Sequence, residues 1–501
     1  MLNIYVDKNI GKIVLKTDDS SARYLLEKTE KETKFIPRLR KYGTITRTTK
    51  IYDNTRVKPD KDGVWTFYLG LGWAGYLASV FFKFMTKAEY DQLLLDAVYS
   101  DNVRTVPFPN LRDYQNSDAL HLLKYKIGLF SCYTSYGKTE LIATLANYFY
   151  GIGKKVLIVT PGQKPRQEVE KRIKERFGID VKNSGGRIMS IITSGLLKRN
   201  DIKDPDQLKK FENELASVDC LLVDEVEYTI NDSGMFIYDR VIHADHFYGF
   251  SGTADKKKGE MISFVNGLDD SIIRNKDLIK YFGPSLVYRM PLDLKVDYIR
   301  VKTSTLNRVK FLPEDFADNT NVYNNVICRI FTDPDVCRLV VKIAKRYPKI
   351  YLPMYNLTSV ISEWLGYFSA AKLRVLLICG EGFLYYDENG VKTKLKDLAE
   401  ACEYVKNDRV DVIPSTSAGF RALDLPGLET TLLTIGKMAG VVLQSVGRTA
   451  RGSHMNLITL EPFPKKKIPV YTSGMKERDE MILQYYKYCD IVESEIFDKN
   501  L

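Results

Sequence analysis

Short apolar runs alternate with charged, helix-like segments along most of the chain. Between about residues 104 and 289, apolar runs such as 155–160 and 220–225 are each followed by a turn and a charged segment. The same rhythm returns between 290 and 460, and such alternation is typical of parallel α/β sheets. The pattern therefore predicts two α/β sheets of similar size in tandem. In the second sheet, strands are expected at 349–355, 374–379, 409–414 and 430–436.

Both ends of the chain follow a different pattern. Residues 1–103 alternate β-like runs with helical segments, which predicts a small α+β module. The tail has a basic run at 464–471 and is expected to end in a helix over 476–497. The predicted regions are therefore 1–103, 104–289, 290–460 and 461–501.

One uncharged stretch, Val64–Phe82, approaches the length that crosses a bilayer. Three glycines interrupt it, at positions 70, 72 and 75. We expect a strand, a tight turn and the start of a buried helix, and no membrane partner. The N-terminus has charges every few residues, so it does not resemble a signal peptide.

Composition narrows the class of protein. In the 501 residues, 45% are hydrophobic and 27% charged, which excludes wholesale disorder, a collagen-like fibre and a coiled-coil rod. Lys plus Arg is 74 and Asp plus Glu is 63, so the net charge of +11 suggests a polyanionic partner. The seven cysteines form no CxxC pair and the four histidines show no metal-ligand spacing, so we expect free thiols in a reducing cytosol.

The segment 129–140 joins an apolar strand to a helix through a compact turn, the context of a phosphate-binding loop. Backbone N–H groups at the helix start would bind the β- and γ-phosphates of ATP. Lys138 would supply a point charge, and the hydroxyl of Thr139 would contact Mg²⁺. Cys132 stands where the pattern GxxxxGK[ST] has its first glycine. The expected loop residues are Thr134, Ser135, Tyr136, Gly137, Lys138 and Thr139.

A second acidic element follows the apolar run that begins at Cys220. Asp224 can hold Mg²⁺ through its waters, and Glu225 can act as general base toward the attacking water. An acidic strand end that caps a helix is common by itself. With a phosphate-binding loop 86 residues earlier (224 − 138), the pair predicts an ATP-hydrolysing site.

These motifs belong to an ordered series over about 104–460 that resembles superfamily 2 helicases. Residues 111–115 resemble the Q motif, so the resemblance implies that Gln115 reads the adenine edge and that Arg112 lies at the nucleotide. Residues 224–227 resemble motif II, with Glu227 in place of the usual His or Asp. Residues 157–161 and 191–195 resemble loops that touch the nucleic-acid backbone, and 251–254 resemble the coupling motif III. The implied residues there are Pro161, Thr193 and Ser194 for nucleic acid, and Ser251 and Thr253 for coupling.

The second sheet has its own half of the series. Residues 415–426 resemble motif V, with Ala422 where glycine is usual, and would place Thr416 at nucleic acid and Asp424 at nucleotide. Residues 444–451 resemble motif VI, with Gln444 at the nucleotide. Its two arginines would reach across a cleft and stabilise transition-state charge on the γ-phosphate; they are Arg448 and Arg451.

The resemblance implies an α/β fold of two tandem RecA-like lobes with a small N-terminal α+β accessory domain. It also implies ATP and Mg²⁺ as cofactors and an active ATP hydrolase.

Residues 34–58 contain eight Lys or Arg and one acidic residue, with interleaved aromatics suited to phosphates and stacking. A solvated basic face would have the same composition. Residues 35–53 resemble the accessory module of phage UvsW-type helicases, which regress forks, migrate Holliday junctions and unwind R-loops or D-loops. The resemblance implies sequence-independent binding of branched or forked DNA, with RNA in hybrids also accepted. It further implies a monomer in the cytoplasm, that of the host if the protein is phage-encoded. The expected contacts are Arg38, Arg40, Lys41 and Arg47.

An Asn-Gly pair within 382–393 is flanked by β-formers, which predicts a hairpin. Tyr385, Tyr386 and Asn389 could make it a strand-separating wedge; a surface hairpin without that role is the alternative. Three other functions stay open: a double-strand translocase that never separates strands, a scaffold that uses ATP only as a structural ligand, and an RNA helicase.

Overall fold

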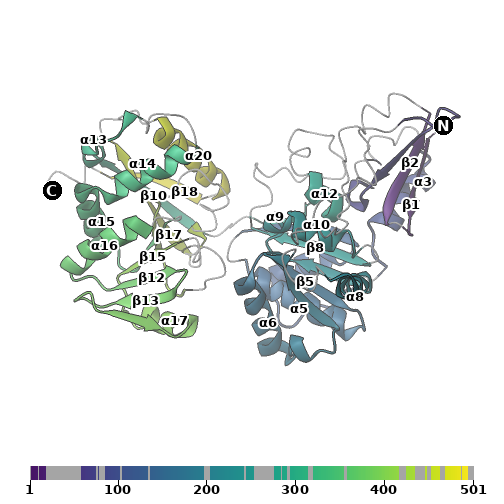
Figure 1. Cartoon of the computed structure of the whole chain (residues 1–501), viewed down its shortest axis with the longest axis horizontal. Coiled ribbons are helices and arrows are strands. Elements are labelled where there is room, and N and C mark those ends of the chain that lie inside the picture. The colour runs from purple at the N-terminus through teal and green to yellow at the C-terminus, as the bar shows by residue number, and fades with distance from the viewer. Residues whose placement is uncertain are drawn as a thin grey trace. The chain divides into compact units, whose positions relative to one another are not determined.

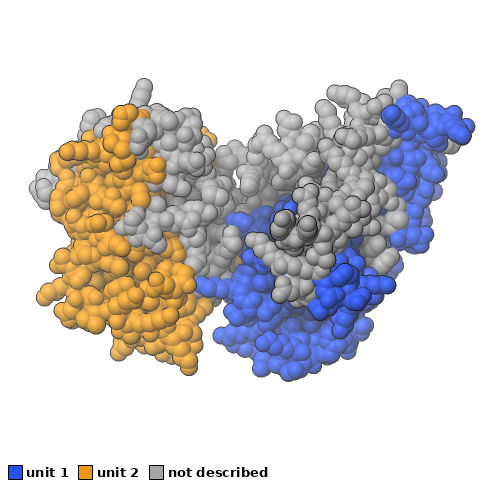
Figure 2. All heavy atoms as spheres, in the orientation of Figure 1, with its two compact units in different colours: residues 1–132, 137–289 blue, residues 133–136, 290–501 orange. Residues whose placement is uncertain are grey.

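The computed structural model of this chain divides into two compact units (Figure 2). Unit 1 comprises residues 1–132 and 137–289, and unit 2 comprises residues 133–136 and 290–501. The residues that the structure describes are 2–9, 11–18, 58–74, 77, 85–101, 104–133, 136–196, 204–241, 244–252, 276–283, 285–289, 294–313, 320–354, 358–416, 425–434, 446–447, 449, 453–462, 469–486 and 488–494.

Unit 1 is built around a six-stranded parallel sheet in the order β6-β5-β7-β8-β4-β9 (Figure 1). Most of its strand residues are buried, as expected of a parallel sheet with both faces covered. The strands are β4 Ile127–Cys132, β5 Val156–Thr160, β6 Ile188–Ile192, β7 Cys220–Val223, β8 His246–Ser251 and β9 Ser285–Arg289. The helices are α4 Asp113–Leu122, α5 Lys138–Gly151, α6 Gln163–Phe177, α8 Pro205–Ala216, α9 Val226–Thr229, α10 Asp232–Tyr238 and α12 Lys276–Phe282, with the 3-10 turn η4 Val181–Asn183.

The N-terminal residues form a three-stranded antiparallel sheet, β1-β2-β3. Its strands are β1 Leu2–Asp7, β2 Lys12–Thr17 and β3 Trp65–Leu69, followed by the 3-10 turn η2 Leu71–Trp73 and helix α3 Lys87–Ala97. The predicted strand and turn at the start of the uncharged stretch are thus confirmed. Within the alternating pattern of residues 1–103, the helix-like segment 20–31 and the β-like run 45–53 lie outside the described residues.

This small sheet shares its core with the parallel sheet. One continuous apolar cluster contains Leu15 and Phe67 from the small sheet together with Leu129 and Leu157 from the large one. Gly70, just after β3, allows the chain to pack closely against α12, because a Cβ at this position would lie 2.4 Å from the backbone oxygen of Lys280 in α12. The predicted domain boundary at residue 103 stays a prediction.

A buried histidine joins the N-terminal region to β8. The Nε2 atom of His246 lies 3.0 Å from Ser100 Oγ, while its Nδ1 is buried without a hydrogen-bond partner within the described part of the chain. Burial is the main cause that lowers the pKa of His246 to about 4; the charge of Asp245 opposes it, and the charges of Lys154 and Lys126 act in the same direction as burial. A proton on this ring would therefore place an unsatisfied charge in the core.

We expect unit 1 to lose stability as the pH falls from about 6.5 to about 4, by up to about 3 kcal/mol. In the unfolded chain, the His246 ring takes up a proton as the pH falls below its ordinary pKa of 6.5. In the folded chain, the same ring stays neutral until the pH reaches about 4. The free energy of unfolding of unit 1, measured by urea titration at several pH values with hydrogen exchange as the readout, gives this loss. His246→Gln removes the titration and should flatten the profile over that range; an unchanged slope in this variant would assign the effect elsewhere.

Unit 2 contains a nine-stranded sheet in the order β14-β13-β12-β15-β11-β16-β17-β10-β18 (Figure 1). All strand pairs are parallel except β12–β13 and β13–β14. The strands are β10 Lys295–Thr303, β11 Ile350–Pro353, β12 Val375–Cys379, β13 Gly382–Tyr386, β14 Lys392–Leu395, β15 Val412–Ser415, β16 Thr430–Leu432, β17 His454–Pro462 and β18 Tyr488–Ser494. The helices are α13 Thr305–Arg308, α14 Thr320–Thr332, α15 Pro334–Arg346, α16 Thr358–Ala370, α17 Leu398–Lys406 and α20 Pro469–Tyr485. Both units are thus RecA-like α/β lobes, and the predicted fold class is confirmed.

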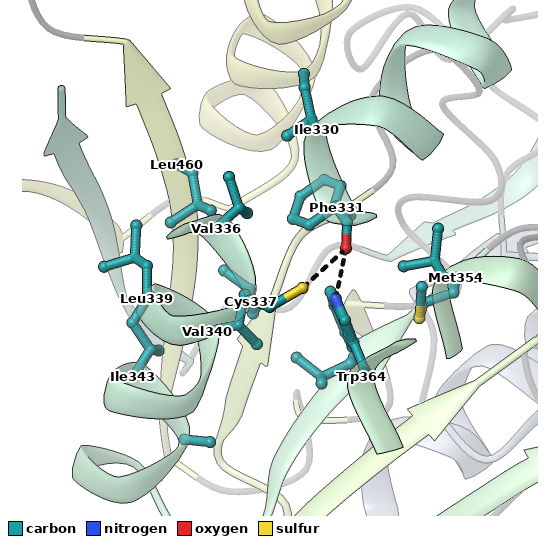
Figure 3. Close-up of a cluster of buried hydrophobic side chains, with 14 of the residues drawn as sticks. Ile330, Phe331, Val336, Cys337, Leu339, Val340, Ile343, Met354, Trp364 and Leu460 are labelled. Carbon is teal, nitrogen blue, oxygen red and sulfur yellow. Dashed lines mark hydrogen bonds between the residues drawn. The ribbon is translucent and has the colours of Figure 1, made fainter. Parts of the chain in front are cut away.

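The end of α14 is tied into the core of unit 2 (Figure 3). Trp364 Nε1 donates a hydrogen bond of 2.7 Å to the carbonyl oxygen of Phe331, and Cys337 Sγ lies 3.6 Å from the same oxygen. This carbonyl belongs to the last turn of α14, where the helix itself provides no donor. Two side chains from α16 and α15 therefore satisfy a backbone group that would otherwise be buried without a partner.

The predicted C-terminal helix over 476–497 is wrong in its bounds. Helix α20 begins earlier, at Pro469, and ends at Tyr485, and β18 follows it. Strand β18 pairs in parallel with β10, and Glu493 forms an ion pair with Lys302. Ladder hydrogen bonds along β10 are available only in the folded sheet, so the helical pattern of the sequence gives way to them.

Within the described part of the chain, no helix is both long and apolar enough to cross a membrane.

Candidate nucleotide site

The predicted ATP residues that the structure describes gather at one edge of the unit 1 sheet. Because β4 to β8 run parallel, the loops after their carboxyl ends lie on the same side. The phosphate-binding loop follows β4, and Asp224 and Glu225 follow β7. Strand β8 lies between β4 and β7 in the sheet, so the loop and the two carboxylates follow strands that are not direct neighbours.

Lys138 and Glu225 form an ion pair at this edge, with 3.2 Å between Nζ and Oε1. Glu225 has a left-handed backbone (φ 46°, ψ 54°), which is uncommon for a residue other than glycine and occurs often at functional sites. Its N–H donates to Asp224 Oδ1 over 3.0 Å. The turn after β7 therefore holds both carboxylates beside the lysine.

The charges of this site are strongly coupled. Burial, and after it the charge of Glu225, raise the pKa of Asp224 to about 8 against the opposing charge of Lys138. Burial alone would lower the pKa of Lys138, yet the nearby anionic groups, Glu225 foremost, raise it above its ordinary value. The site thus concentrates negative charge around one ammonium group.

A divalent cation suits this donor set. Carboxylates and hydroxyls are the ligands that Mg²⁺ prefers, and Asp224 and Thr139 offer one of each. Asp224 is 6% exposed and would gain from a nearby positive charge. Glu225 Oε2 is buried without a hydrogen-bond partner within the described residues, so it is free to accept from a water. These features fit both Mg²⁺ and the predicted general base.

The loop glycine and the Q-motif glutamine contact each other. Gly137 has φ +97°, and Gln115 Nε2 lies 3.5 Å from its carbonyl oxygen. Gln115 is 3% exposed, and its Oε1 accepts from the N–H of Arg112 over 3.1 Å. A Cβ on Gly137 would lie only 2.5 Å from Gln115 Nε2. No sequence motif indicated this contact, which links the predicted adenine-reading segment to the phosphate-binding loop.

We expect Gly137→Ala to lower kcat/KM for ATP about 10-fold or more, because the left-handed backbone costs about 1–2 kcal/mol and the new methyl displaces Gln115. Steady-state ATPase assays measure the effect. Gly153→Ala is the matched control: Gly153 also has positive φ (+87°), but no atom lies within 4 Å of the place that an added methyl would take. If both variants lower kcat/KM equally, the contact between Gly137 and Gln115 does not contribute to ATP hydrolysis.

Three predicted nucleic-acid residues, Pro161, Thr193 and Ser194, also lie at this edge, but two of them are buried. The N–H of Thr193 donates to the carbonyl oxygen of Thr160 over 3.0 Å, which joins the two loops. Pro161 and Thr193 are buried, whereas Ser194 is exposed. Their roles stay predictions, and of these three side chains Ser194 is the one accessible to a phosphate. Ser251, at the end of β8, is fully buried.

A further ion-pair cluster joins the start of α5 to α6. Glu140 follows Thr139 in α5 and contacts Arg172 Nε at 3.4 Å and Arg176 Nε at 3.1 Å, both in α6. Helix α6 begins just after Pro161. No motif pointed to these residues, although their spacing of four places both arginines on one helix face.

In unit 2, the predicted hairpin is confirmed and its shape is specific. Strands β13 and β14 pair antiparallel and form the end of the nine-stranded sheet. Asp387 Oδ1 accepts from the N–H groups of Asn389 and Val391, and Gly390 has φ +78°. A Cβ on Gly390 would lie 2.7 Å from Ser369 Oγ, so the turn packs against the end of α16.

Both hairpin tyrosines pack on their own unit. Tyr385 has its ring 4.7 Å from that of Tyr404 in α17, and Tyr386 packs against the core beside α14–α16. Glu388, Asn389 and Val391 are exposed at the turn. Thr416 is 7% exposed, with its hydroxyl 3.4 Å from the carbonyl oxygen of Ile378. The wedge and the nucleic-acid contact of Thr416 stay predictions.

Eleven predicted site residues lie outside the described residues. They are Arg38, Arg40, Lys41, Arg47, Thr134, Ser135, Thr253, Asp424, Gln444, Arg448 and Arg451.

Comparison with known proteins gives distant similarities. No protein-family model matches the chain. Putative helicase 22 of Sulfolobus islandicus filamentous virus (isolate Iceland/Hveragerdi) is 21% identical over 268 residues, which are 50% of this chain and 43% of that protein. The chain therefore spans less than half the length of this curated relative.

Solved structures are similar over longer spans. T4 UvsW is 13% identical with a TM-score of 0.36, covering 98% of this chain and 99% of that one. Dbp5 of S. cerevisiae, bound to RNA and ADP BeF3, is 11% identical with a TM-score of 0.46, covering 76% and 89%. Because these TM-scores lie below 0.5, the functional conclusions depend on the motifs and geometry of this chain.

The parallel sheet of unit 1, the mostly parallel sheet of unit 2 and the converging Lys138, Asp224 and Glu225 define an α/β protein with a predicted phosphate-binding loop. Its ordered motifs resemble those of superfamily 2 helicases.

Proposed function

We propose that this protein is an ATP-dependent superfamily 2 helicase or translocase that remodels branched DNA. The observation that carries the proposal is the meeting of Lys138, Asp224 and Glu225 at one sheet edge, with Glu225 Oε2 left for a water. The ordered motifs of the second sheet and the basic segment 34–58 support it from the sequence.

The residues of the site have separable roles in hydrolysis. Lys138 would leave Glu225 and bind the β- and γ-phosphate oxygens of ATP, which frees the carboxylate. Glu225 would then accept a proton from the water that attacks the γ-phosphate. Thr139 and Asp224 would hold Mg²⁺, which supplies positive charge to the phosphate oxygens when bound. Arg448 and Arg451 would stabilise the charge that develops on the γ-phosphate.

Movement on DNA would follow from the nucleotide cycle. ATP would be a shared ligand of both lobes, and its hydrolysis would release them from each other. Each lobe would hold the phosphodiester backbone through its own loops, so binding would be independent of sequence and would weaken with salt.

A double-strand translocase that does not separate strands is the second candidate. The hairpin geometry favours it, because β13 and β14 continue the sheet, the turn packs near Ser369, and both tyrosines pack on their own unit.

Two assays on the same protein distinguish these functions. Migration of a synthetic four-way junction tests branched-DNA remodelling, and displacement of a triplex-forming strand from a plain duplex tests translocation alone. Junction migration that needs ATP supports the proposal. Triplex displacement without junction migration or fork unwinding would replace it with the translocase, and equal activity on RNA duplexes would replace it with an RNA helicase.

A further inference from the structure

Two buried threonine hydroxyls join strand β16 to the motif VI segment of unit 2. Thr431 Oγ1 lies 2.9 Å from Thr449 Oγ1, and both side chains have no exposed surface. Thr449 Oγ1 in turn donates to the carbonyl oxygen of Val446 over 3.0 Å. With the Thr449 proton directed to that carbonyl, the Thr431 hydroxyl donates to Thr449 Oγ1; either hydroxyl can serve as donor in the pair.

The segment is held at two points close in sequence. The N–H of Thr449 also donates to the carbonyl oxygen of Val446, over 3.0 Å, which closes a turn. The side chain of Val446 is fully buried in an apolar cluster with Leu433 and Met455. The turn is thus fixed by apolar packing at its first residue and by a hydroxyl bond at its last.

Arg448 stands between Gly447 and Thr449 in the sequence. The residues with defined contacts around it are Val446, two positions before, and Thr449, one position after. A misplacement of about 1 Å in a positioning group can cost about 100-fold in rate. The contacts that hold Val446 and Thr449 should therefore affect the rate of hydrolysis far more than the affinity for nucleotide.

We propose that Thr431 is a positioning residue for the motif VI arginine Arg448, acting through its hydroxyl bond to the adjacent Thr449. This inference rests on the proposed function, in which Arg448 stabilises the transition state of ATP hydrolysis. Motif patterns do not include Thr431, which lies in a strand 17 residues before Arg448 (448 − 431).

Thr430 supplies a matched control on the neighbouring position. It is also buried, at 4% exposure, and its hydroxyl accepts from Asn456 Nδ2 over 3.3 Å. Adjacent residues of a strand face opposite sides of the sheet, so Thr430 points away from the face of Thr431. Thr430→Val and Thr431→Val therefore remove equivalent hydroxyls with different neighbours.

The test compares these variants in the full-length protein by steady-state ATPase kinetics. Thr431→Val should lower kcat about 10- to 100-fold with KM for ATP changed less than about 2-fold. Thr431→Ser should restore kcat, because it keeps the hydroxyl, and Thr430→Val should behave like the unchanged protein. Thr431→Ala against Thr431→Ser repeats the comparison if the valine variant does not fold.

A second readout separates positioning from a general loss of stability. Affinity for ADP with aluminium fluoride, a transition-state analogue, should fall in Thr431→Val, while affinity for ADP alone should not change. Equal kinetics of Thr431→Val and Thr430→Val, or a serine variant as slow as the valine one, would overturn the proposal. Arg448→Ala checks the assumption beneath it: full ATPase activity in that variant would refute the arginine assignment, whatever Thr431 does.

Discussion

Replacing Glu225 with glutamine is expected to lower kcat for ATP hydrolysis by a factor of about 10² to 10⁴ while ATP still binds. Glutamine has the same shape but cannot accept a proton from water at neutral pH. The buried Oε2 of Glu225 has no partner within the described residues and is the atom that would take this proton. Single-turnover hydrolysis and equilibrium binding of labelled ATP measure the two quantities separately.

Glu227→Gln is the control for this change. It removes the same charge two positions later, in helix α9, and we expect kcat within about threefold of the unchanged protein, since no step of base catalysis is assigned to it. Hydrolysis that persists in Glu225→Gln would show that Glu225 is not the base. It would also restore the alternative in which ATP is only a structural ligand.

Lys138→Ala is expected to weaken ATP binding about 10- to 100-fold and to lower kcat as well, because hydrogen bonds to charged groups contribute about 1.5–3 kcal/mol. The change removes the ammonium that opposes the raised pKa of Asp224. The buried Asp224 and the half-buried Glu225 would then lack a compensating charge, which disfavours a further anionic ligand. Titration with a fluorescent ATP analogue, with and without Mg²⁺, measures the loss.

Lys154→Ala provides the comparison. Lys154 also forms an ion pair, with Asp245, but it precedes β5 and so lies at the opposite end of the parallel strands from the phosphate-binding loop. We expect unchanged ATP affinity there. Equal weakening in both variants would mean that charge in general, and not the loop lysine, determines binding.

Elements whose structure is determined by a few consecutive residues were predicted well from the sequence. The buried strands β5 and β7 are continuous apolar runs, and the phosphate-binding loop has a glycine at the one position with φ +97°. The hairpin at 382–395 followed from its Asn-Gly pair. In each case the residues that decide the structure are neighbours in sequence.

Features that depend on distant pairing could not be predicted in this way. The position of β8 between β4 and β7 depends on which strand edges meet, and no local pattern reports that. The contact of Gln115 with Gly137 and the bond between Thr431 and Thr449 join segments that are separate in sequence. Strand β18 was predicted as helix because its pairing with β10 lies nearly 200 residues away in the chain, from Lys295 to Tyr488.

The most direct test of the central claim is the rate of ATP hydrolysis by the full chain with single-stranded, duplex, forked and four-way DNA, and with RNA. A nucleotide site coupled to branched DNA predicts low basal hydrolysis, strong stimulation by forked and four-way DNA, and loss of that stimulation as salt rises. An ATPase rate that is the same with and without every nucleic acid would contradict the account.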